Sequence, residues 1–310
     1  MMMNDLSTGE ILNPTFFGLD PELSHYGTSR AAVFGLPFGA SVSYGRGAEK
    51  GPSAILEASQ QVELFDHELG FNPCDAGIAT VAPELLDSLL DTHEAVKAAI
   101  ARVLPPLLDD GKFPVMLGGD HSVTPPMIAV LRDRYPSLGI LQIDAHADLR
   151  DSYDEDPESH ACAIRRALDH GISHVVGVGI RNLSEPEWEF LQAQTNLTEV
   201  WGGTWLKPWD AFCAEVDQAI SKLPSHVYLT IDVDGLDPSI MPSTGTPEPG
   251  GLTWQHVCYV LDRLFGSRTV VAMDINELAP IEKLHGPDFL VAKLMYRAIG
   301  LKFRGLLGRE

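Results

Sequence analysis

Three metal-capable side chains stand at every second position in the stretch IDAHADLR (143–150). They are Asp144, His146 and Asp148, and they follow an apolar run. In a strand, residues i, i+2 and i+4 face the same way, so the three side chains begin on one face, and the chain must then curl for them to converge. Because carboxylates and imidazoles bind divalent cations, the stretch indicates either a metal site or an ordinary polar strand end.

Two further stretches place the same residue types after apolar runs. YLTIDVDGLDP (228–238) contains Asp232 and Asp234, and VMLGGDHS (115–122) contains Asp120 and His121. Taken alone, an Asp after a strand is commonly a turn former or a helix cap. Clustered buried carboxylates, however, repel one another unless a cation neutralises them, so the coincidence of three stretches favours a metal site. Oxygen ligands, a minority of imidazoles and no thiolate indicate manganese or a similar divalent ion, and so many ligands indicate two ions.

The elements that would position these residues follow from the hydrophobic pattern. Short apolar runs cover residues 31–37, 113–119, 138–144, 173–179, 226–232 and 268–274. Stretches of helical character between them include residues 85–110, 159–170, 208–223 and 255–265. This alternation predicts an α/β fold with a parallel sheet covered by helices on both faces. Several runs end in Gly or Asp, so the polar residues are expected at the carboxyl edge of the sheet, where such folds bind ligands.

Composition excludes several classes of function. The chain has 310 residues with 22 Lys and Arg against 43 Asp and Glu, a formal charge of -21, which would repel nucleic acid and anionic membranes. The four cysteines lie far apart and form no C-x-x-C pair, which indicates neither a disulfide framework nor a zinc ribbon. The N-terminal segment has no signal-peptide pattern, and no apolar stretch approaches the roughly 20 residues that cross a bilayer. We therefore expect a soluble cytoplasmic protein.

Three motifs in this order resemble the ureohydrolase family of arginase and agmatinase. They are GGDHS (118–122), DAHADLRD (144–151) and DVDGLDPSIMPSTGTPEPGG (232–251). SHACAIRRAL (159–168), GIRN (179–182) and MDINELAP (273–280) also match. The resemblance begins near Ala31 and implies the three-layer arginase/deacetylase fold with a mostly parallel eight-stranded sheet. We expect an N-terminal arm over residues 1–30 and a single catalytic domain over residues 31–310.

The resemblance also implies a ligand set for two Mn²⁺ ions per subunit. The first ion would be held by His121, Asp144, Asp148 and Asp232. The second would be held by Asp144, His146, Asp232 and Asp234, so that Asp144 and Asp232 bridge the ions. A hydroxide between the two ions would attack the guanidinium carbon.

Three residues carry predicted catalytic roles. Asp148 would relay a proton to the departing nitrogen. By the resemblance, His160 would pass protons between solvent and the site, and Glu277 would pair with the planar guanidinium. The alternatives are an exposed residue at a helix start for His160 and an exposed turn for Glu277.

The loop DLRDSYDEDPESH (148–160) bears on the substrate. Its acidic residues, Asp151, Asp154, Glu155, Asp156 and Glu158, would form a negative mouth that attracts a distal ammonium and repels an α-carboxylate. The alternative for these residues is an ordinary solvated loop.

A negative mouth favours agmatine, a small cationic guanidino substrate whose hydrolysis to putrescine and urea would be a step of polyamine biosynthesis. Hydrolysis of guanidinobutyrate, guanidinopropionate, guanidine or arginine stays open, since Ser243 stands where the family usually has Gly. A single-zinc deacetylase-like hydrolase and a non-catalytic metal-binding homologue are further alternatives. The resemblance also implies a homotrimer or homohexamer.

Overall fold

The computed structural model describes residues 14–86, 90–203 and 207–308. Its strands, in chain order, are β1 (Ala31–Leu36), β2 (Ile78–Thr80), β3 (Phe113–Gly118), β4 (Leu138–Ile143), β5 (His174–Val178), β6 (Leu197–Val200), β7 (His226–Asp232) and β8 (Thr269–Asn276). They form one 8-stranded sheet in the order β2-β1-β3-β8-β7-β4-β5-β6. Each neighbouring pair in this sheet is parallel, which confirms the predicted fold class.

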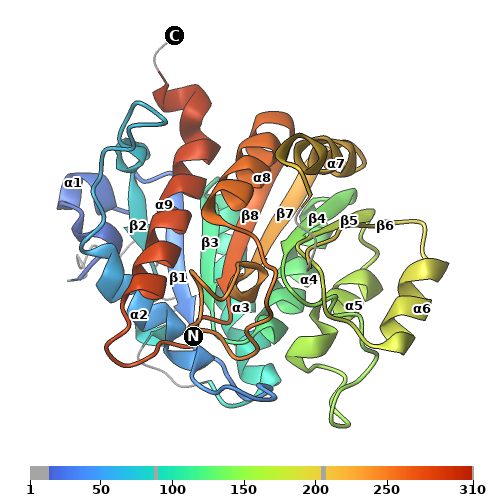
Figure 1. Ribbon diagram of the computed structural model, residues 1–310. Helices are drawn as coiled ribbons and strands as arrows, with labels where there is room; N and C mark the ends of the chain where they lie inside the picture. The colour runs from blue at the N-terminus through green and yellow to red at the C-terminus, as the bar shows by residue number, and fades with distance from the viewer. Residues whose placement is uncertain (1–13, 87–89, 204–206, 309–310) are drawn as a thin grey trace.

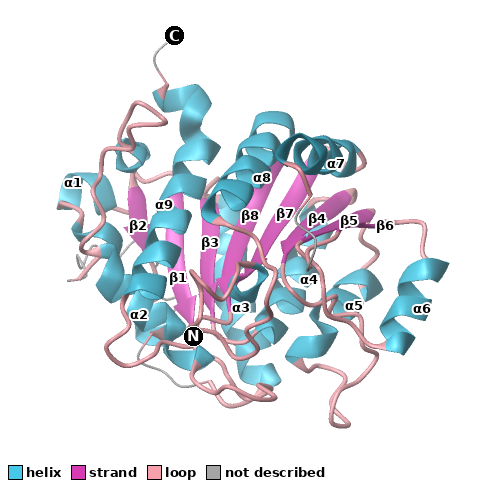
Figure 2. Ribbon diagram, in the orientation of Figure 1, coloured by secondary structure: helices cyan, strands magenta, loops and turns pink. Residues whose placement is uncertain are grey.

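The α-helices connect the strands and lie on both sides of the sheet (Figures 1 and 2). They are α1 (Pro21–Ser24), α2 (Gly51–Ser59), α3 (His93–Asp109), α4 (Thr124–Arg134), α5 (Ala163–Asp169), α6 (Glu185–Ala193), α7 (Trp209–Ser221), α8 (Trp254–Ser267) and α9 (Gly286–Leu307). Buried residues of α2, α7, α8 and α9 belong to one core cluster, and those of α3, α4, α5 and α6 to a second. The sheet is therefore the middle of three layers. Among the described residues, no helix has both the length and the apolar character needed to cross a bilayer.

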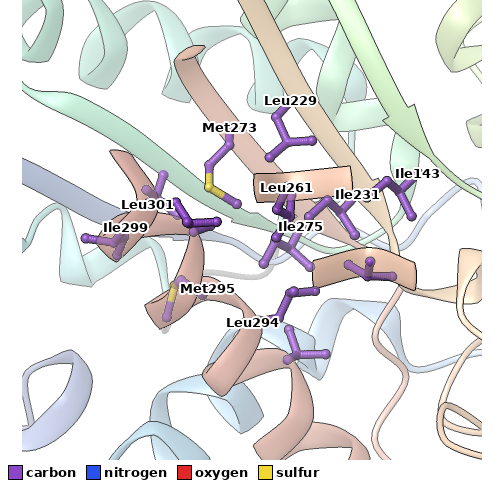
Figure 3. Close-up of a cluster of buried hydrophobic side chains, with 14 of the residues drawn as sticks. Ile143, Leu229, Ile231, Leu261, Met273, Ile275, Leu294, Met295, Ile299 and Leu301 are labelled. Atoms are coloured by element: carbon purple, nitrogen blue, oxygen red, sulfur yellow. The ribbon is translucent and has the colours of Figure 1, made fainter. Parts of the chain in front are cut away.

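The central strands divide their side chains between the two cores. On β4, Leu141 and Ile143 belong to the first cluster, whereas Leu138 and Ile140 belong to the second. Such strands are apolar on both faces, which is why they are recognisable in the sequence as continuous apolar runs. Figure 3 shows the first cluster, where side chains from β7 and β8 meet those of α8 and α9.

The six apolar runs all become strands, but the helix bounds differ in places. The helix expected from residue 85 begins at His93, because Thr92 caps it by accepting the backbone N–H of Ala95 at 3.2 Å. Part of the expected segment, residues 87–89, lies outside the described residues. The short strands β2 and β6 escape the search for apolar runs. In β6 the sequence LTEV gives little hydrophobic signal.

Residues 14–30, the described part of the expected N-terminal arm, pack against the first core. Phe16 and Phe17 are buried, and the Phe17 ring centroid lies 4.6 Å from that of Tyr296 on α9. The backbone N–H of Phe17 donates to Ser59 Oγ at 2.9 Å. Burying each phenylalanine stabilises this attachment by roughly 1.5–3 kcal/mol.

Candidate metal centre

The predicted site residues follow four neighbouring strands, β3, β8, β7 and β4, at their carboxyl ends. His121 lies three residues after β3, and Asp144 directly follows β4. Asp232 is the last residue of β7 and pairs in register with Asn276 of β8, so Glu277 emerges beside it. Because all four strands are parallel, residues distant in sequence reach one edge of the sheet.

One glycine and a capping aspartate turn the chain between β3 and His121. A Cβ on Gly119 would lie 1.7 Å from the carbonyl oxygen of Phe38, so only glycine fits between these backbones. Asp120 then caps a short 3-10 helix (His121–Val123) by accepting the backbone N–H of Ser122 at 3.1 Å. Asp120 thus positions the turn, and His121 is directed into the centre.

His121 faces three carboxylates. Its Nδ1 lies 2.9 Å from Asp148 Oδ2, 3.2 Å from Asp144 Oδ2 and 3.6 Å from Asp232 Oδ2. The ligand atoms of His121, Asp144 and Asp232 lie within 4.8 Å of one another, and we call these three residues the His121 group. All three side chains are buried.

A second set, the His146 group, consists of Asp144, His146 and Asp234. His146 Nδ1 lies 2.9 Å from Asp234 Oδ2 and 3.8 Å from Asp144 Oδ1. The two oxygens of Asp144 therefore face different histidines, as expected of a bridging ligand. Asp232, also expected to bridge, falls in the His121 group alone, and its Oδ1 accepts the backbone N–H of Asp234 at 2.9 Å.

Two site residues have left-handed backbone conformations. Asp148 has φ 53° and Glu277 has φ 66°, a region that non-glycine residues seldom adopt. Such strain persists only where the surroundings hold it, and it concentrates at functional sites. The conformation of Asp148 supplies the curl that the spacing of Asp144, His146 and Asp148 required.

His160 and Glu277 meet beside the metal ligands. His160 Nδ1 lies 3.1 Å from Glu277 Oε1, and the same oxygen accepts the backbone N–H of His121 at 2.8 Å. Neither residue is exposed: the side chains are 14% and 5% accessible. The expected alternatives, an exposed helix start and an exposed turn, therefore do not describe these two residues.

Clustering shifts the pKa values of the site. Burial and the charges of Asp148 and Asp234 raise the pKa of Asp144 to about 7. Burial alone would lower the pKa of His146, but its interaction with Asp234 outweighs burial and raises that pKa to about 10. Burial would likewise lower the pKa of His160, but hydrogen bonding to Glu277 raises it to about 9. The centre therefore carries an excess of negative charge that cations would offset.

The donor set fits a divalent cation. Nδ1 of His121 is buried and has no hydrogen-bond partner among the described residues, although three carboxylate oxygens lie within 3.6 Å of it. A divalent cation at this position would bind the ring nitrogen and the carboxylate oxygens together. Carboxylates in the majority, two imidazoles and no thiolate match manganese or a similar ion.

A cleft of about 190 Å³ opens onto the centre. Five predicted site residues line it: His146, Asp148, His160, Asp232 and Asp234. The cleft therefore gives a small molecule access to both groups of ligands.

The walls of the cleft differ from the expected negative mouth. As the structure describes it, no acidic residue of 151–158 lines the cleft, whereas Arg150 and Tyr153 do. Asp151 pairs instead with Arg166 of α5 at 2.8 Å, and Glu158 pairs with Lys97 of α3 at 2.6 Å. The carboxylates of this loop therefore do not form the expected negative lining of the cleft. Asp154 and Glu155 are exposed, as the alternative of an ordinary solvated loop expects.

Sequence reasoning did not find the residues that hold the ligands in place. Gln142 Nε2 donates to Asp144 Oδ2 at 2.8 Å and to the carbonyl of His146 at 3.0 Å. Arg181 donates to the carbonyls of Asp234 and Glu248, both at 2.7 Å. Arg181 stands in the GIRN motif, so the motif marked its position, but nothing in the motif indicated its partners.

A sequence model of the arginase family matches residues 29–300 of this chain. The chain belongs to the arginase family. This confirms the resemblance drawn from the three motifs, and the protein is accordingly an arginase-family hydrolase.

The arginase-family chain is similar to several ureohydrolases over most of its length. It is 37% identical over 286 residues to the N(1)-aminopropylagmatine ureohydrolase of Synechocystis sp., with 90% of each chain covered. It is 36% identical over 292 residues to an enzyme of that name from Thermus thermophilus, covering 92% of this chain and 95% of the relative. It is 33% identical over 278 residues to the agmatinase of Pyrococcus horikoshii, covering 88% and 92%.

Solved structures show the same fold. Agmatine ureohydrolase of Thermoplasma volcanium superposes with a TM-score of 0.77 at 28% identity, covering 91% of this chain and 92% of the other. Arginase from Medicago truncatula superposes with a TM-score of 0.72 at 23% identity, covering 89% and 88%. The three-layer arginase fold expected from the motifs is therefore confirmed.

Proposed function

We propose that the protein is a binuclear manganese ureohydrolase that cleaves a guanidino compound with an amine-bearing tail, releasing urea. The observation that carries the proposal is Asp144, whose two oxygens face His121 and His146 beside a cleft. One carboxylate shared between two histidine-containing groups suits two ions better than the single zinc of a deacetylase-like site.

The ions would be held by His121, Asp144, Asp148 and Asp232 on one side and by His146, Asp144 and Asp234 on the other. When bound, two adjacent divalent cations supply a water molecule acidic enough to attack near neutral pH. This matters because a guanidinium carbon is a poor electrophile.

Hydrolysis joins a water oxygen to the guanidinium carbon and breaks the bond from that carbon to the alkyl-bearing nitrogen. The departing nitrogen must gain a proton. His160 lines the cleft and has a raised pKa, so it can hold a proton and pass it between solvent and the site. Asp148 also lines the cleft, and we assign it to relaying a proton from the attacking water to the departing nitrogen.

Glu277 has a predicted contact with the substrate guanidinium. Its Oε1 already holds the backbone of His121 and the ring of His160, so the carboxylate is fixed in place. A fixed carboxylate suits the planar guanidinium fork, and we assign Glu277 to orienting that group.

Agmatine is the first candidate substrate, and its hydrolysis would yield putrescine. A second candidate is N(1)-aminopropylagmatine, because relatives 34–37% identical carry that name. Both are guanidino compounds with amine tails, and the second has one amine more. Because no carboxylate of residues 151–158 lines the cleft, the support for an amine tail comes from the names of the relatives.

Urea release by manganese-loaded protein tests the proposal. The panel comprises agmatine, N(1)-aminopropylagmatine, arginine, guanidinobutyrate, guanidinopropionate and guanidine. We expect kcat/KM for at least one of the amine-tailed compounds to exceed that for every carboxylate-bearing compound by tenfold or more, about 1.4 kcal/mol. A preference for arginine or guanidinobutyrate would refute the substrate class, and protein active with one ion per chain would refute the binuclear site.

A further inference from the structure

A buried polar chain runs from His121 into the protein, on the side of the ring away from the carboxylates. His121 Nε2 lies 2.7 Å from Oγ1 of Thr230, a fully buried residue of β7. Thr230 stands two positions before Asp232 on β7. The same strand therefore supplies the predicted ligand Asp232 and the residue that contacts Nε2 of His121.

The chain ends at Asp274, a carboxylate on the neighbouring strand β8 with no solvent exposure. Its Oδ2 accepts the hydroxyls of Thr124 at 2.6 Å and of Tyr228 at 2.5 Å. Its Oδ1 accepts Nδ2 of Asn276 at 3.0 Å. Burial raises the pKa of Asp274, and the charge of His121 and the hydrogen bond from Thr124 oppose that shift.

The direction of each hydrogen bond follows from these partners. A carboxylate only accepts, so the hydroxyl hydrogens around Asp274 point toward it. Thr124 Oγ1 already donates its hydrogen to Asp274, so Thr230 is the donor in the 3.5 Å contact between Thr230 Oγ1 and Thr124 Oγ1. The lone pair of Thr230 is then left for His121, whose Nε2 must be the donor.

A histidine protonated at Nε2 carries its lone pair at Nδ1, the atom that faces Asp144, Asp148 and Asp232. Hydrogen bonds to the far nitrogen of a metal-binding histidine fix its ring and its tautomer. We propose that Thr230, backed by Asp274, is a positioning residue that presents Nδ1 of His121 to a cation in the His121 group.

The two ligand groups would then differ in their support. The His121 ring has no solvent exposure and is hydrogen-bonded to Thr230 through Nε2, whereas the His146 side chain is 24% accessible. Loss of the Thr230 hydroxyl should therefore weaken one ion and spare the other. The inference rests on the metal sites of the proposed function and is independent of which guanidino compound is cleaved.

The test is calorimetric titration of Mn²⁺ into chelator-stripped full-length protein, with circular dichroism to verify folding. Thr230→Val keeps the side-chain shape and removes the hydroxyl. We expect it to weaken one of two Mn²⁺ sites by about tenfold to hundredfold and to leave the other unchanged. Thr230→Ser, which restores a hydroxyl, should return that affinity to within about threefold of the wild type.

Two further variants separate positioning from general loss of structure. Tyr228→Phe removes a hydroxyl from Asp274 without touching His121, so both Mn²⁺ affinities should persist even if the melting temperature falls. Asp274→Asn should weaken the same Mn²⁺ site as Thr230→Val. It tests the same proposal if the valine variant does not fold.

Unchanged affinities in folded Thr230→Val, or equal weakening in Tyr228→Phe, would overturn the role of Thr230 while leaving the binuclear proposal intact. Wild-type protein that binds no Mn²⁺ would instead overturn the proposed function, and the inference with it.

Discussion

His160 Nδ1 lies 3.1 Å from Glu277 Oε1, and that oxygen also accepts the backbone N–H of His121 at 2.8 Å. One carboxylate oxygen therefore ties a predicted proton donor to the backbone of a predicted metal ligand. Because the ring of His160 is held through Nδ1, its Nε2 is the atom left for proton transfer.

Replacing His160 should slow the reaction without emptying the metal site. We expect His160→Ala to lower kcat by about 10²–10⁴, the usual contribution of a general acid or base. Manganese content by elemental analysis should match the wild type, because His160 belongs to neither ligand group. Loss of manganese in this variant would show that His160 supports the ligands rather than the proton transfer.

Replacing Asp232, unlike replacing His160, should remove manganese from the protein. Its carboxylate belongs to the His121 group and caps the following turn through the backbone N–H of Asp234. We expect Asp232→Ala to bind fewer ions per chain and to lose measurable turnover. Asp232→Asn, which keeps the shape and can still accept that N–H, is the matched control for the turn. Full manganese content in both variants would contradict the ligand role.

Removing the metal should also destabilise the fold, since ions bind the native state and offset repulsion among Asp144, Asp148 and Asp232. At a hundredfold excess over the dissociation constant, one ion stabilises by about 2.7 kcal/mol. We expect the chelated protein to melt several degrees lower than the protein with excess Mn²⁺, measured by scanning calorimetry. Asp232→Ala should show a smaller difference, and an equal one would argue that the gain arises elsewhere.

The sequence was sufficient for the architecture and for the gathering of the candidate site. Strands buried on both faces, such as β4, read as unbroken apolar runs, and parallel strands bring their ends to one edge. Asp144, Asp232 and His121 could therefore be placed together from the sequence, because Asp232 ends such a strand, Asp144 directly follows one and His121 stands in the turn after one.

What the sequence could not supply were contacts between side chains far apart in the chain. Asp274 lies 150 residues from its donor Thr124, and no local pattern pairs them. The directions of the acidic side chains in residues 151–158 could not be predicted for the same reason. Asp151, for example, pairs with Arg166 of α5, 15 residues further along the chain. Charge counted along the sequence gives the sign of a segment but not the direction in which its side chains point.

Arg181 offers a test of how the Asp234 turn is held. Its guanidinium donates to the carbonyls of Gly179 at 2.9 Å and of Asp234 and Glu248 at 2.7 Å. Lysine keeps the charge but loses the planar fork, so Arg181→Lys should lower the free energy of unfolding by about 2–4 kcal/mol. We also expect weaker Mn²⁺ binding in the His146 group, measured by calorimetric titration.

Arg132→Lys is the matched control for Arg181. Arg132 also donates to carbonyls, those of His170 at 3.0 Å and Gly171 at 3.1 Å, but in the loop that follows α5 rather than at the metal centre. It should lose stability in urea denaturation and keep both Mn²⁺ affinities. If the two variants bind manganese equally well, Arg181 stabilises the fold without positioning Asp234.

Glu199 should make the fold less stable as the pH rises from 4.5 to about 8. Its Oε2 is buried on β6 without a hydrogen-bond partner among the described residues, so close to Gly177 that a Cβ there would lie 1.9 Å away. Burial raises the pKa of Glu199 from 4.5 to about 8. Between these two pKa values Glu199 is ionised in the unfolded chain but protonated in the folded chain. Its contribution to the free energy of unfolding is therefore fully present below pH 4.5 and is lost as the pH rises to about 8.

A glutamine at this position cannot ionise and should remove that loss. Glu199→Gln should therefore match the wild type in melting temperature near pH 4.5 and exceed it by about 2–5 °C near pH 8.5. Glu189→Gln on the exposed surface of α6 is the control and should shift neither value. A Glu199→Gln protein that gains no stability at alkaline pH would mean that the carboxylate ionises in place, with water or a cation reaching Oε2 from the edge of the sheet.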